Sequence, residues 1–454
     1  MPLSVPVRRR LAWLSISLLV LALLAATQRA AHSLPRLPSP VPASAGHRLV
    51  NTHPLAAPPT TADCQAQFQI NCYSPNQYRT AYGVDTVNAR RITGRGTTIA
   101  IVDAFGSPTI AQDLKTFDAA FGLPDPPSIR TIAPAGALPP FDPADATMNG
   151  WAFETTLDVE YAHAMAPDAN ILVVATPVAE TEGITGFPEI VQAENFVIDH
   201  GLADVISQSF GATENTFPGD TDFRALRSAF FNAADRGVTV LGASGDSGAT
   251  DFELDLTTLY PFRVNSWPSS DPLVTSIGGT QLHLDAAGRR TSPDVVWNDG
   301  FGAGGGGLSL LFDRPGFQDV VRDVVQDKRG TPDISMTAAV NGAAIVYTSF
   351  DPNTVGYHLV GGTSEATPIF AGIVALADQF AGHRLGDLNE PLYQLASAAR
   401  RPSGIVDVTS GNNSFHGVTG FPATGGYDLA SGWGTIDAPA FVPALALTAG
   451  GRNR

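Results

Sequence analysis

The chain has 454 residues, of which 44% are hydrophobic and 15% are charged, and its formal net charge is −16. It can bury one large core or two ordinary ones, and its 45 glycines and 35 prolines are typical of a loop-rich globular protein rather than a coiled coil. The strong negative charge argues against a nucleic-acid partner or an anionic membrane surface.

The N-terminal residues have the pattern of an export signal. Arg8–Arg10 precede an apolar run from Leu11 to Ala26, and small residues continue to Ser33. We therefore expect residues 1–33 to be a secretory signal peptide, and the mature protein to be secreted, extracellular and free of the membrane. An uncleaved anchor is the alternative, although the apolar run is short for a spanning helix.

Residues 34–72 are rich in proline and alanine in their first part and predict a flexible linker or a short pro-segment. They contain Cys64 and Cys72, the only two cysteines of the chain. Outside the cytosol, one small disulfide loop is the expected state of such a pair.

From Tyr73 onward, helical patterns alternate with continuously apolar strands. The expected elements, in chain order, are a strand Thr97–Asp103, helices Thr109–Phe121 and Gly150–Met165, a strand Asn170–Thr176, a helix Phe187–His200, a strand Asp204–Ser209, a helix Thr221–Arg236 and a strand Val238–Ala243. This rhythm predicts an α/β fold whose mainly parallel sheet is covered by helices on both faces. Ligand sites in such sheets lie beyond the carboxyl ends of the strands.

Two carboxylates share one face of the helix predicted for residues 150–165. Glu154 and Asp158 are four residues apart and therefore neighbours on the helix surface. The residues around them are mostly apolar, which leaves little room for the alternative of a solvated acidic face. Two carboxyls in one site hold a proton between them, and such a pair can act as a general base with a supporting acid.

A serine and an aspartate lie in two further informative loops. Ser364 follows the turn Gly361–Gly362 and begins an apolar helix, where its hydroxyl suits an acyl-transfer nucleophile; a plain helix N-cap is the alternative. Asp246 lies in the segment Ser244–Gly248, directly after a predicted strand, and its alternative interpretation is a turn former.

Taken together, these motifs resemble the sedolisin family of serine-carboxyl peptidases, which share the subtilisin fold. The resemblance covers residues 73–447 and leaves 448–454 as a tail. It implies a subtilisin-like three-layer fold, with Ser364 as nucleophile, Glu154 as general base and acid, Asp158 as its orienting partner and Asp246 as the oxyanion donor. A glutamate base and a protonated aspartate donor both require acid, because an ordinary carboxyl is ionised at neutral pH.

The histidines argue against an ordinary subtilisin triad. Such a triad would pair Asp103 with a His-Gly-Thr segment, which the chain does not contain. His163 follows Asp158 by five residues and faces away from it, so we interpret it as structural. Asp103 ends a strand near the expected site, and either a supporting role or a loop cap remains open for it.

Two C-terminal segments, 407–413 and 423–428, resemble the calcium-binding segments of the family. The resemblance implies one Ca²⁺ held by the side chains of Asp407 and Asp428 and by the carbonyls of Val408, Thr424 and Gly426. Calcium prefers such oxygen ligands. A glycine- and asparagine-rich surface loop is the alternative.

The segment 207–211 resembles the edge strand on which subtilisin-like enzymes lay an extended peptide, which implicates Ser209, Phe210 and Gly211 in substrate binding. A core strand is the alternative. We expect a secreted, monomeric, calcium-binding endopeptidase that cleaves polypeptides at acidic pH. The alternatives are a tripeptidyl-peptidase of the same family and an inactive sedolisin-like binding protein, although the full catalytic set argues against the latter.

Overall fold

The computed structural model describes residues 48–51, 53–217, 220–398 and 403–450. The helices of this part of the chain are α2 (Thr61–Phe68), α3 (Pro75–Ala81), α4 (Val84–Asn88), α5 (Ile110–Phe121), α6 (Ala146–Met165), α7 (Phe187–Asp199), α8 (Asp220–Leu226), α9 (Ser228–Arg236), α10 (Arg322–Val325), α11 (Thr363–Ala381), α12 (Asn389–Ser397) and α13 (Ala438–Gly450), with two 3-10 helices at Glu214–Thr216 and Gly316–Val321.

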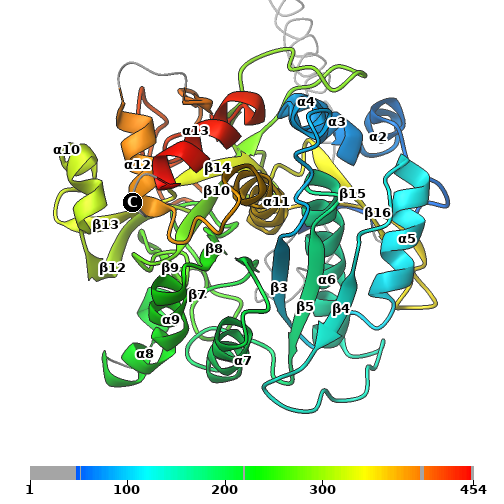
Figure 1. The fold of residues 1–454 in the computed structure, drawn as a ribbon, viewed down its shortest axis with the longest axis horizontal. Coiled ribbons are helices and arrows are strands. Elements are labelled where there is room, and N and C mark those ends of the chain that lie inside the picture. The colour runs from blue at the N-terminus through cyan, green and yellow to red at the C-terminus, as the bar shows by residue number, and fades with distance from the viewer. Residues whose placement is uncertain (1–47, 52, 218–219, 399–402, 451–454) are drawn as a thin grey trace, which may run out of the picture. The chain divides into compact units, whose positions relative to one another are not determined.

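The strands are β1 (Arg48–Leu49), β2 (Cys72–Tyr73), β3 (Thr98–Ala104), β4 (Ile129–Ile132), β5 (Asn170–Thr176), β6 (Val205–Gln208), β7 (Ala212–Thr213), β8 (Thr239–Ala243), β9 (Ser266–Trp267), β10 (Thr275–Gln281), β11 (Val295–Val296), β12 (Gly307–Asp313), β13 (Lys328–Thr331), β14 (Ile334–Thr337), β15 (Ala343–Thr348), β16 (Gly356–Gly361), β17 (Ile405–Val406) and β18 (Thr435–Ile436). Figure 1 shows their arrangement.

The main sheet has eight strands in the order β11-β10-β8-β6-β3-β5-β4, and β14 pairs with β10. Every pairing in it is parallel except that of β10 with β11. The central strands β3, β5 and β8 are mostly apolar and buried, as expected for a parallel sheet covered on both sides. The predicted α/β class is therefore confirmed.

Side chains of β3 alternate between two cores, one on each face of the sheet. Ile99 and Ile101 belong to the core that contains the apolar residues of α6 and α11. Ala100 and Val102 belong to the core formed with α7 and α9, which lie together in Figure 1. Successive side chains on a strand point to opposite faces, so Asp103 continues the first series and points toward α6 and α11.

The expected elements are present with small shifts at their ends and one break. The helix predicted for residues 221–236 is two helices, α8 and α9, which meet at Arg227. Helix α6 begins four residues earlier than expected because Asp145 caps it, accepting hydrogen bonds from the backbone N–H groups of Thr147 and Met148.

The chain from Arg48 to Cys72 corrects the prediction of a flexible linker over this part. Strand β1 pairs antiparallel with β16, and Leu55 bridges to Tyr357, so backbone hydrogen bonds fix the segment. Helix α2 has a capping box at Thr60, and the predicted disulfide between Cys64 and Cys72 is present with a Cα–Cα distance of 5.9 Å. The predicted signal peptide, residues 1–33, lies outside the described residues.

The C-terminal boundary also differs from expectation, because α13 continues through Gly450 and includes residues assigned to the tail. Among the helices that the structure describes, none has both the length and the apolar character needed to cross a bilayer.

Candidate active site

Helices α6 and α11 approach each other closely where Gly372 faces α6. A Cβ atom at Gly372 would lie 2.5 Å from the Cβ of Met165 and 3.0 Å from the carbonyl oxygen of Ala162. Real Cβ atoms do not tolerate such distances, so glycine is required here. The close packing sets the carboxylates of α6 beside the start of α11.

Ser364 is the second residue of α11 and is fully buried. The chain enters this helix from β16 through Gly361, where a Cβ would lie 2.7 Å from the backbone nitrogen of Val340. Ser364 Oγ lies 3.4 Å from the carbonyl oxygen of Ser209, at the carboxyl end of β6. The nucleophile candidate thus lies where ligand sites of parallel sheets are found.

Glu154 and Asp158 are both fully buried in the middle of α6, which excludes the solvated acidic face. Asp158 Oδ1 accepts a hydrogen bond of 3.0 Å from the Ser209 hydroxyl. The same hydroxyl is 3.3 Å from the carbonyl oxygen of Ser364. Ser209 therefore connects the carboxylate helix to the backbone of the candidate nucleophile.

Asp103 joins this pair as a third buried carboxyl. It has no exposed surface, and burial followed by the charge of Glu154 raises its pKa well above the usual value. Burial raises the pKa of Asp158 in the same way, with the charges of Asp103 and Glu154 as the next causes. Three carboxyls within range of one another cannot all ionise at low cost, so this cluster retains protons. Asp103 therefore lies close enough to Glu154 and Asp158 for the supporting role that the sequence left open.

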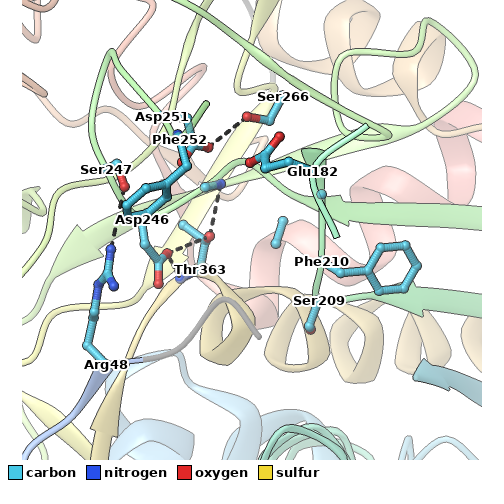
Figure 2. A pocket seen from close by; sticks show the side chains of 13 residues that line it. Arg48, Glu182, Ser209, Phe210, Asp246, Ser247, Asp251, Phe252, Ser266 and Thr363 are labelled. Atoms are coloured by element: carbon cyan, nitrogen blue, oxygen red, sulfur yellow. Dashed lines mark hydrogen bonds between the residues drawn. The ribbon is translucent and has the colours of Figure 1, made fainter. Parts of the chain in front are cut away.

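Asp246 contacts the residue that precedes the candidate nucleophile. Its Oδ1 accepts hydrogen bonds from the backbone nitrogen of Thr363 at 2.7 Å and from the Thr363 hydroxyl at 2.9 Å (Figure 2). Its Oδ2 is buried without a hydrogen-bond partner among the described residues. Burial raises the pKa of Asp246 to about 7; the charge of Glu154 also raises it, while Arg48 and the Thr363 bonds lower it.

The segment Ser209–Gly211 requires a correction. Strand β6 is a central strand between β3 and β8, so the interpretation of residues 207–211 as an edge strand was wrong, and the alternative of a core strand holds for Ser207 and Gln208. Ser209–Gly211 lie beyond its end and line the pocket beside Asp246. The Phe210 side chain is 2% exposed and packs against Trp151 and Phe187, so Phe210 can offer substrate mainly its backbone.

His163 is separate from this site. Its Nε2 lies 3.2 Å from a carboxylate oxygen of Asp118 and 2.8 Å from the carbonyl oxygen of Pro124, both near the end of α5. These contacts explain why a fully buried histidine lies on α6, as the structural interpretation expected.

The two C-terminal segments come together around Asp407 and Asp428. Asp407 Oδ2 accepts a hydrogen bond of 2.8 Å from the backbone nitrogen of Gly426. Asp428 Oδ2 accepts one of 2.8 Å from the nitrogen of Thr424, and its Oδ1 lies 3.1 Å from the Ser431 hydroxyl. That hydroxyl is 3.4 Å from the carbonyl oxygen of Val408. The structure thus joins the segments that the sequence paired.

Sequence reasoning missed other residues of the site, namely Arg48, Glu182, Asp251 and Thr363. Thr363 could have been found as the neighbour of Ser364. Glu182 follows β5 and Asp251 follows β8, so a search of strand-end loops for carboxylates would have found both.

The comparisons with known proteins agree with this geometry. Residues 147–390 match the model of the subtilase family. The chain is 32% identical over 403 residues to kumamolisin from Bacillus sp. (strain MN-32), covering 85% of this chain and 67% of that protein. It is 30% identical over 314 residues to tripeptidyl-peptidase 1 from Canis lupus familiaris, covering 64% of this chain and 51% of that protein.

A solved structure of Pseudomonas sedolisin, a serine-carboxyl proteinase complexed with two molecules of pseudo-iodotyrostatin, superposes with a TM-score of 0.69 at 29% identity, over 85% of this chain and 99% of that one. The fold and the site define a subtilisin-like serine peptidase domain. The chain belongs to the sedolisin family of serine-carboxyl peptidases within the subtilases. It spans about half to two thirds of the length of the curated relatives it matches.

Proposed function

We propose that this protein is a serine-carboxyl endopeptidase that hydrolyses polypeptides in acid. The observation that carries the proposal is the placement of Ser364 at the start of α11, among buried carboxyls and next to a residue bonded to Asp246. No histidine is found among the described residues that line the adjacent pocket. A carboxyl base is the remaining type of proton acceptor there.

In the first step, Glu154 accepts the proton of Ser364 Oγ while the oxygen attacks the carbonyl carbon of the scissile peptide bond. The carbonyl π electrons move to the oxygen, which becomes a tetrahedral oxyanion. Asp103 and Asp158 lie in the same buried cluster and retain protons there, so Glu154 is the member that accepts the proton of Ser364, which makes the cluster one charge less negative until Glu154 returns it.

In the second step, Glu154 gives its proton to the leaving nitrogen, the C–N bond breaks and an ester to Ser364 remains. Water then repeats the sequence: Glu154 takes its proton, the hydroxide portion adds to the ester carbon, and Ser364 Oγ leaves with the proton returned by Glu154.

Asp246 stabilises both oxyanions as a neutral acid. Because its Oδ1 already accepts two hydrogen bonds from Thr363, its proton belongs on Oδ2, which has no other partner in the described part of the chain. The pKa of about 7 keeps this carboxyl protonated in acid. As the pH rises through that value the donor is lost, so activity should fall toward neutrality.

The proposal includes one Ca²⁺ at the paired C-terminal segments. The available donors are oxygens, from two carboxylates and nearby carbonyls, and they fit a hard cation. Asp407, Asp428 and the carbonyls of Val408, Thr424 and Gly426 would hold it. When bound, the ion would cross-link the two segments and neutralise their carboxylates.

The signal peptide predicted for residues 1–33 supports secretion, and we propose that a monomer acts outside the cell. The similarity to tripeptidyl-peptidase 1 supports one alternative mode, removal of tripeptides from a free N-terminus. The two modes differ in whether a blocked N-terminus prevents cleavage.

Digestion of casein and of an N-acetylated peptide library between pH 3 and pH 8 tests the proposal. We expect cleavage of the blocked peptides with a maximum below about pH 6, where Asp246 is neutral. Ser364→Ala should reduce kcat by at least about a thousandfold while the protein stays folded. Ser276→Ala, which removes a buried hydroxyl in β10, should remain active. Wild-type turnover in Ser364→Ala would reject the mechanism, and cleavage of unblocked peptides alone would favour the tripeptidyl mode.

A further inference from the structure

Glu365 directly follows the candidate nucleophile in the first turn of α11. It is fully buried, and it is not among the residues that line the pocket beside Asp246. Its backbone nitrogen donates a hydrogen bond of 3.0 Å to the carbonyl oxygen of Gly362. Because Glu365 belongs to the same turn as Thr363 and Ser364, whatever displaces its side chain displaces those two residues as well.

The side chain of Glu365 lies among buried tyrosines, namely Tyr78 on α3, Tyr82 at the end of that helix and Tyr161 on α6. The hydroxyls of Tyr78 and Thr337 are its polar neighbours. Neither of its carboxyl oxygens has a hydrogen bond of normal geometry in the described part of the chain. The mechanism proposed above gives this buried acid no role.

Two of the tyrosines direct their protons to backbone carbonyls. The Tyr78 hydroxyl donates a hydrogen bond of 2.5 Å to the carbonyl oxygen of Gly342. The Tyr161 hydroxyl donates one of 3.1 Å to the carbonyl oxygen of Ile345 and accepts one of 2.9 Å from the same residue's nitrogen. Since a hydroxyl has one proton, both tyrosines present only oxygen lone pairs to Glu365. Lone pairs accept a hydrogen bond from a protonated carboxyl and repel a carboxylate.

The charges around Glu365 do not compensate a carboxylate either. In the described part of the chain, the groups whose charges act on it are Asp246 and the three tyrosines, and no cation is among them. Arg290 lies over the ring of Tyr82, but it is paired with Asp294. The site therefore suits the neutral acid.

Burial raises the pKa of Glu365 well above its usual value, and the charge of Asp246 raises it further. The Tyr78 hydroxyl would lower it as a donor, but its proton is used on a backbone carbonyl. A helix N-terminus favours a carboxylate only weakly compared with the effect of full burial. The folded protein thus keeps a proton on Glu365.

We propose that Glu365 is a positioning residue that holds the first turn of α11, and with it Ser364 and the contact between Thr363 and Asp246, firmly in place only while its carboxyl carries a proton. The consequence for catalysis rests on the proposed function. The opening of the turn does not, and it can be measured without any substrate.

The pH dependence of the opening follows from where the proton is held. When the turn opens, water reaches Glu365 and its pKa returns to about 4.3. The closed turn therefore holds a proton that the open turn releases. Below about pH 4.3 the closed turn has its full stability, and each pH unit above that value favours opening by up to about tenfold, until the pH reaches the pKa of the closed state.

Hydrogen exchange followed by mass spectrometry measures this opening in the full chain. The amides of Gly362 and Thr363 are suitable probes, since they donate hydrogen bonds to Ala338 and Asp246. We expect the protection factors of residues 362–367 to fall about a hundredfold or more between pH 4.5 and pH 7. Those of β5, a buried strand without acidic residues, should fall less.

Glu365→Gln places a neutral amide of the same size in the site and should reduce the fall at residues 362–367 at least about tenfold. An equal fall in the parent and in this variant would overturn the inference. If the variant does not fold, the parent decides, because equal falls at residues 362–367 and in β5 would show that only global unfolding depends on pH and would overturn the inference as well.

Glu160→Gln is the matched control. It removes another fully buried carboxyl, one that accepts its hydrogen bond from the backbone nitrogen of Tyr347 and not from α11. It should leave the fall at residues 362–367 as in the parent. Equal reductions in Glu160→Gln and Glu365→Gln would mean that the exchange reports global stability, and would reject a local role of Glu365.

Inactivation separates this inference from the proposed function. After incubation at pH 7.5 and return to pH 4.5, the parent should lose peptidase activity at least about tenfold faster than Glu365→Gln, because the rate follows the population of the open turn. Equal rates would overturn the role of Glu365 with the proposed function intact. A difference in exchange between the two proteins, in a chain that cleaves neither casein nor blocked peptides, would retain the switch and reject the proposed function.

Discussion

The backbone nitrogen of Thr363 lies 2.7 Å from Oδ1 of Asp246, and Thr363 directly precedes Ser364. The candidate acid and the candidate nucleophile are therefore positioned by the same turn of α11, although they are more than a hundred residues apart in the chain. Gly245 strengthens the link, because its nitrogen donates a hydrogen bond of 3.1 Å to the Thr363 hydroxyl. Any movement of the α11 start moves both groups together.

The first prediction follows from this link. Asp246→Asn should keep the bonds to Thr363 through its amide oxygen and present an N–H donor that does not titrate. Because the proposed mechanism needs the native carboxyl in its protonated form, the activity of the parent should fall as pH rises through about 7. The asparagine variant should lose some rate in acid but show a flatter alkaline limb, measured as kcat/KM against pH.

Asp246→Ala provides the comparison, since it removes the donor and should cost about a hundredfold or more in kcat. An alanine variant as active as the parent, or an alkaline limb that is unchanged in Asp246→Asn, would contradict the assignment.

The second prediction concerns Asp103 as a positioning residue. Asp103→Asn removes a proton-sharing carboxyl next to Glu154, so we expect kcat to fall about ten- to a hundredfold and the acid limb of the pH profile to move. KM should change less, because Asp103 is not among the residues that line the substrate pocket.

The matched control is Glu194→Gln. Glu194 is a buried carboxyl on α7, on the other side of the sheet, and burial raises its pKa to about 8. We expect Glu194→Gln to change the stability of the protein but not its kcat. If Asp103→Asn shows only that same behaviour, Asp103 is merely structural.

Much of the fold could be predicted because its strands are short, apolar and regularly separated by helices. The Glu154–Asp158 pair and Ser364 were likewise visible as local motifs. The central position of β6 was not, because the order of strands depends on long-range pairing that the local pattern of residues 205–208 does not record. For the same reason, Arg48 could not be predicted as a residue of the pocket. It reaches the pocket because β1 pairs with β16, about 310 residues later in the chain.

The third prediction uses a buried acid outside the proposed chemistry. Glu160 is fully buried on α6, where it accepts a hydrogen bond of 3.1 Å from the backbone nitrogen of Tyr347. Burial raises its pKa well above that of the unfolded chain, so the folded state holds a proton that the unfolded state releases. The stability associated with this proton is complete below the unfolded pKa near about 4.3 and decreases as pH rises above it.

Glu160→Gln should therefore raise Tm at pH 7 by a few degrees relative to the parent and have little effect at pH 4, measured by circular dichroism. Glu189→Gln, at a partly exposed position on α7, should show no such pH dependence. The glutamine can keep the bond from Tyr347 through its amide oxygen. A Glu160→Gln variant that is less stable than the parent at both pH values would therefore contradict the prediction.

The last prediction tests the calcium proposal. A ligand that binds only the folded state stabilises it by RT ln(1 + [L]/Kd), about 2.7 kcal/mol at a hundred times Kd. EDTA should thus lower Tm, and added CaCl2 should restore it. Asp407 is exposed, and within the described part of the chain its carboxylate accepts one hydrogen bond, from the backbone nitrogen of Gly426, which an asparagine can keep through its amide oxygen. Asp407→Asn should therefore have nearly the Tm of the EDTA-treated parent and gain little from calcium.

The control is Asp255→Asn, in an exposed turn, which should respond to calcium as the parent does. Equal responses of Asp407→Asn and the parent would exclude Asp407 as a ligand, and a parent that keeps its Tm after prolonged dialysis against EDTA would exclude the ion.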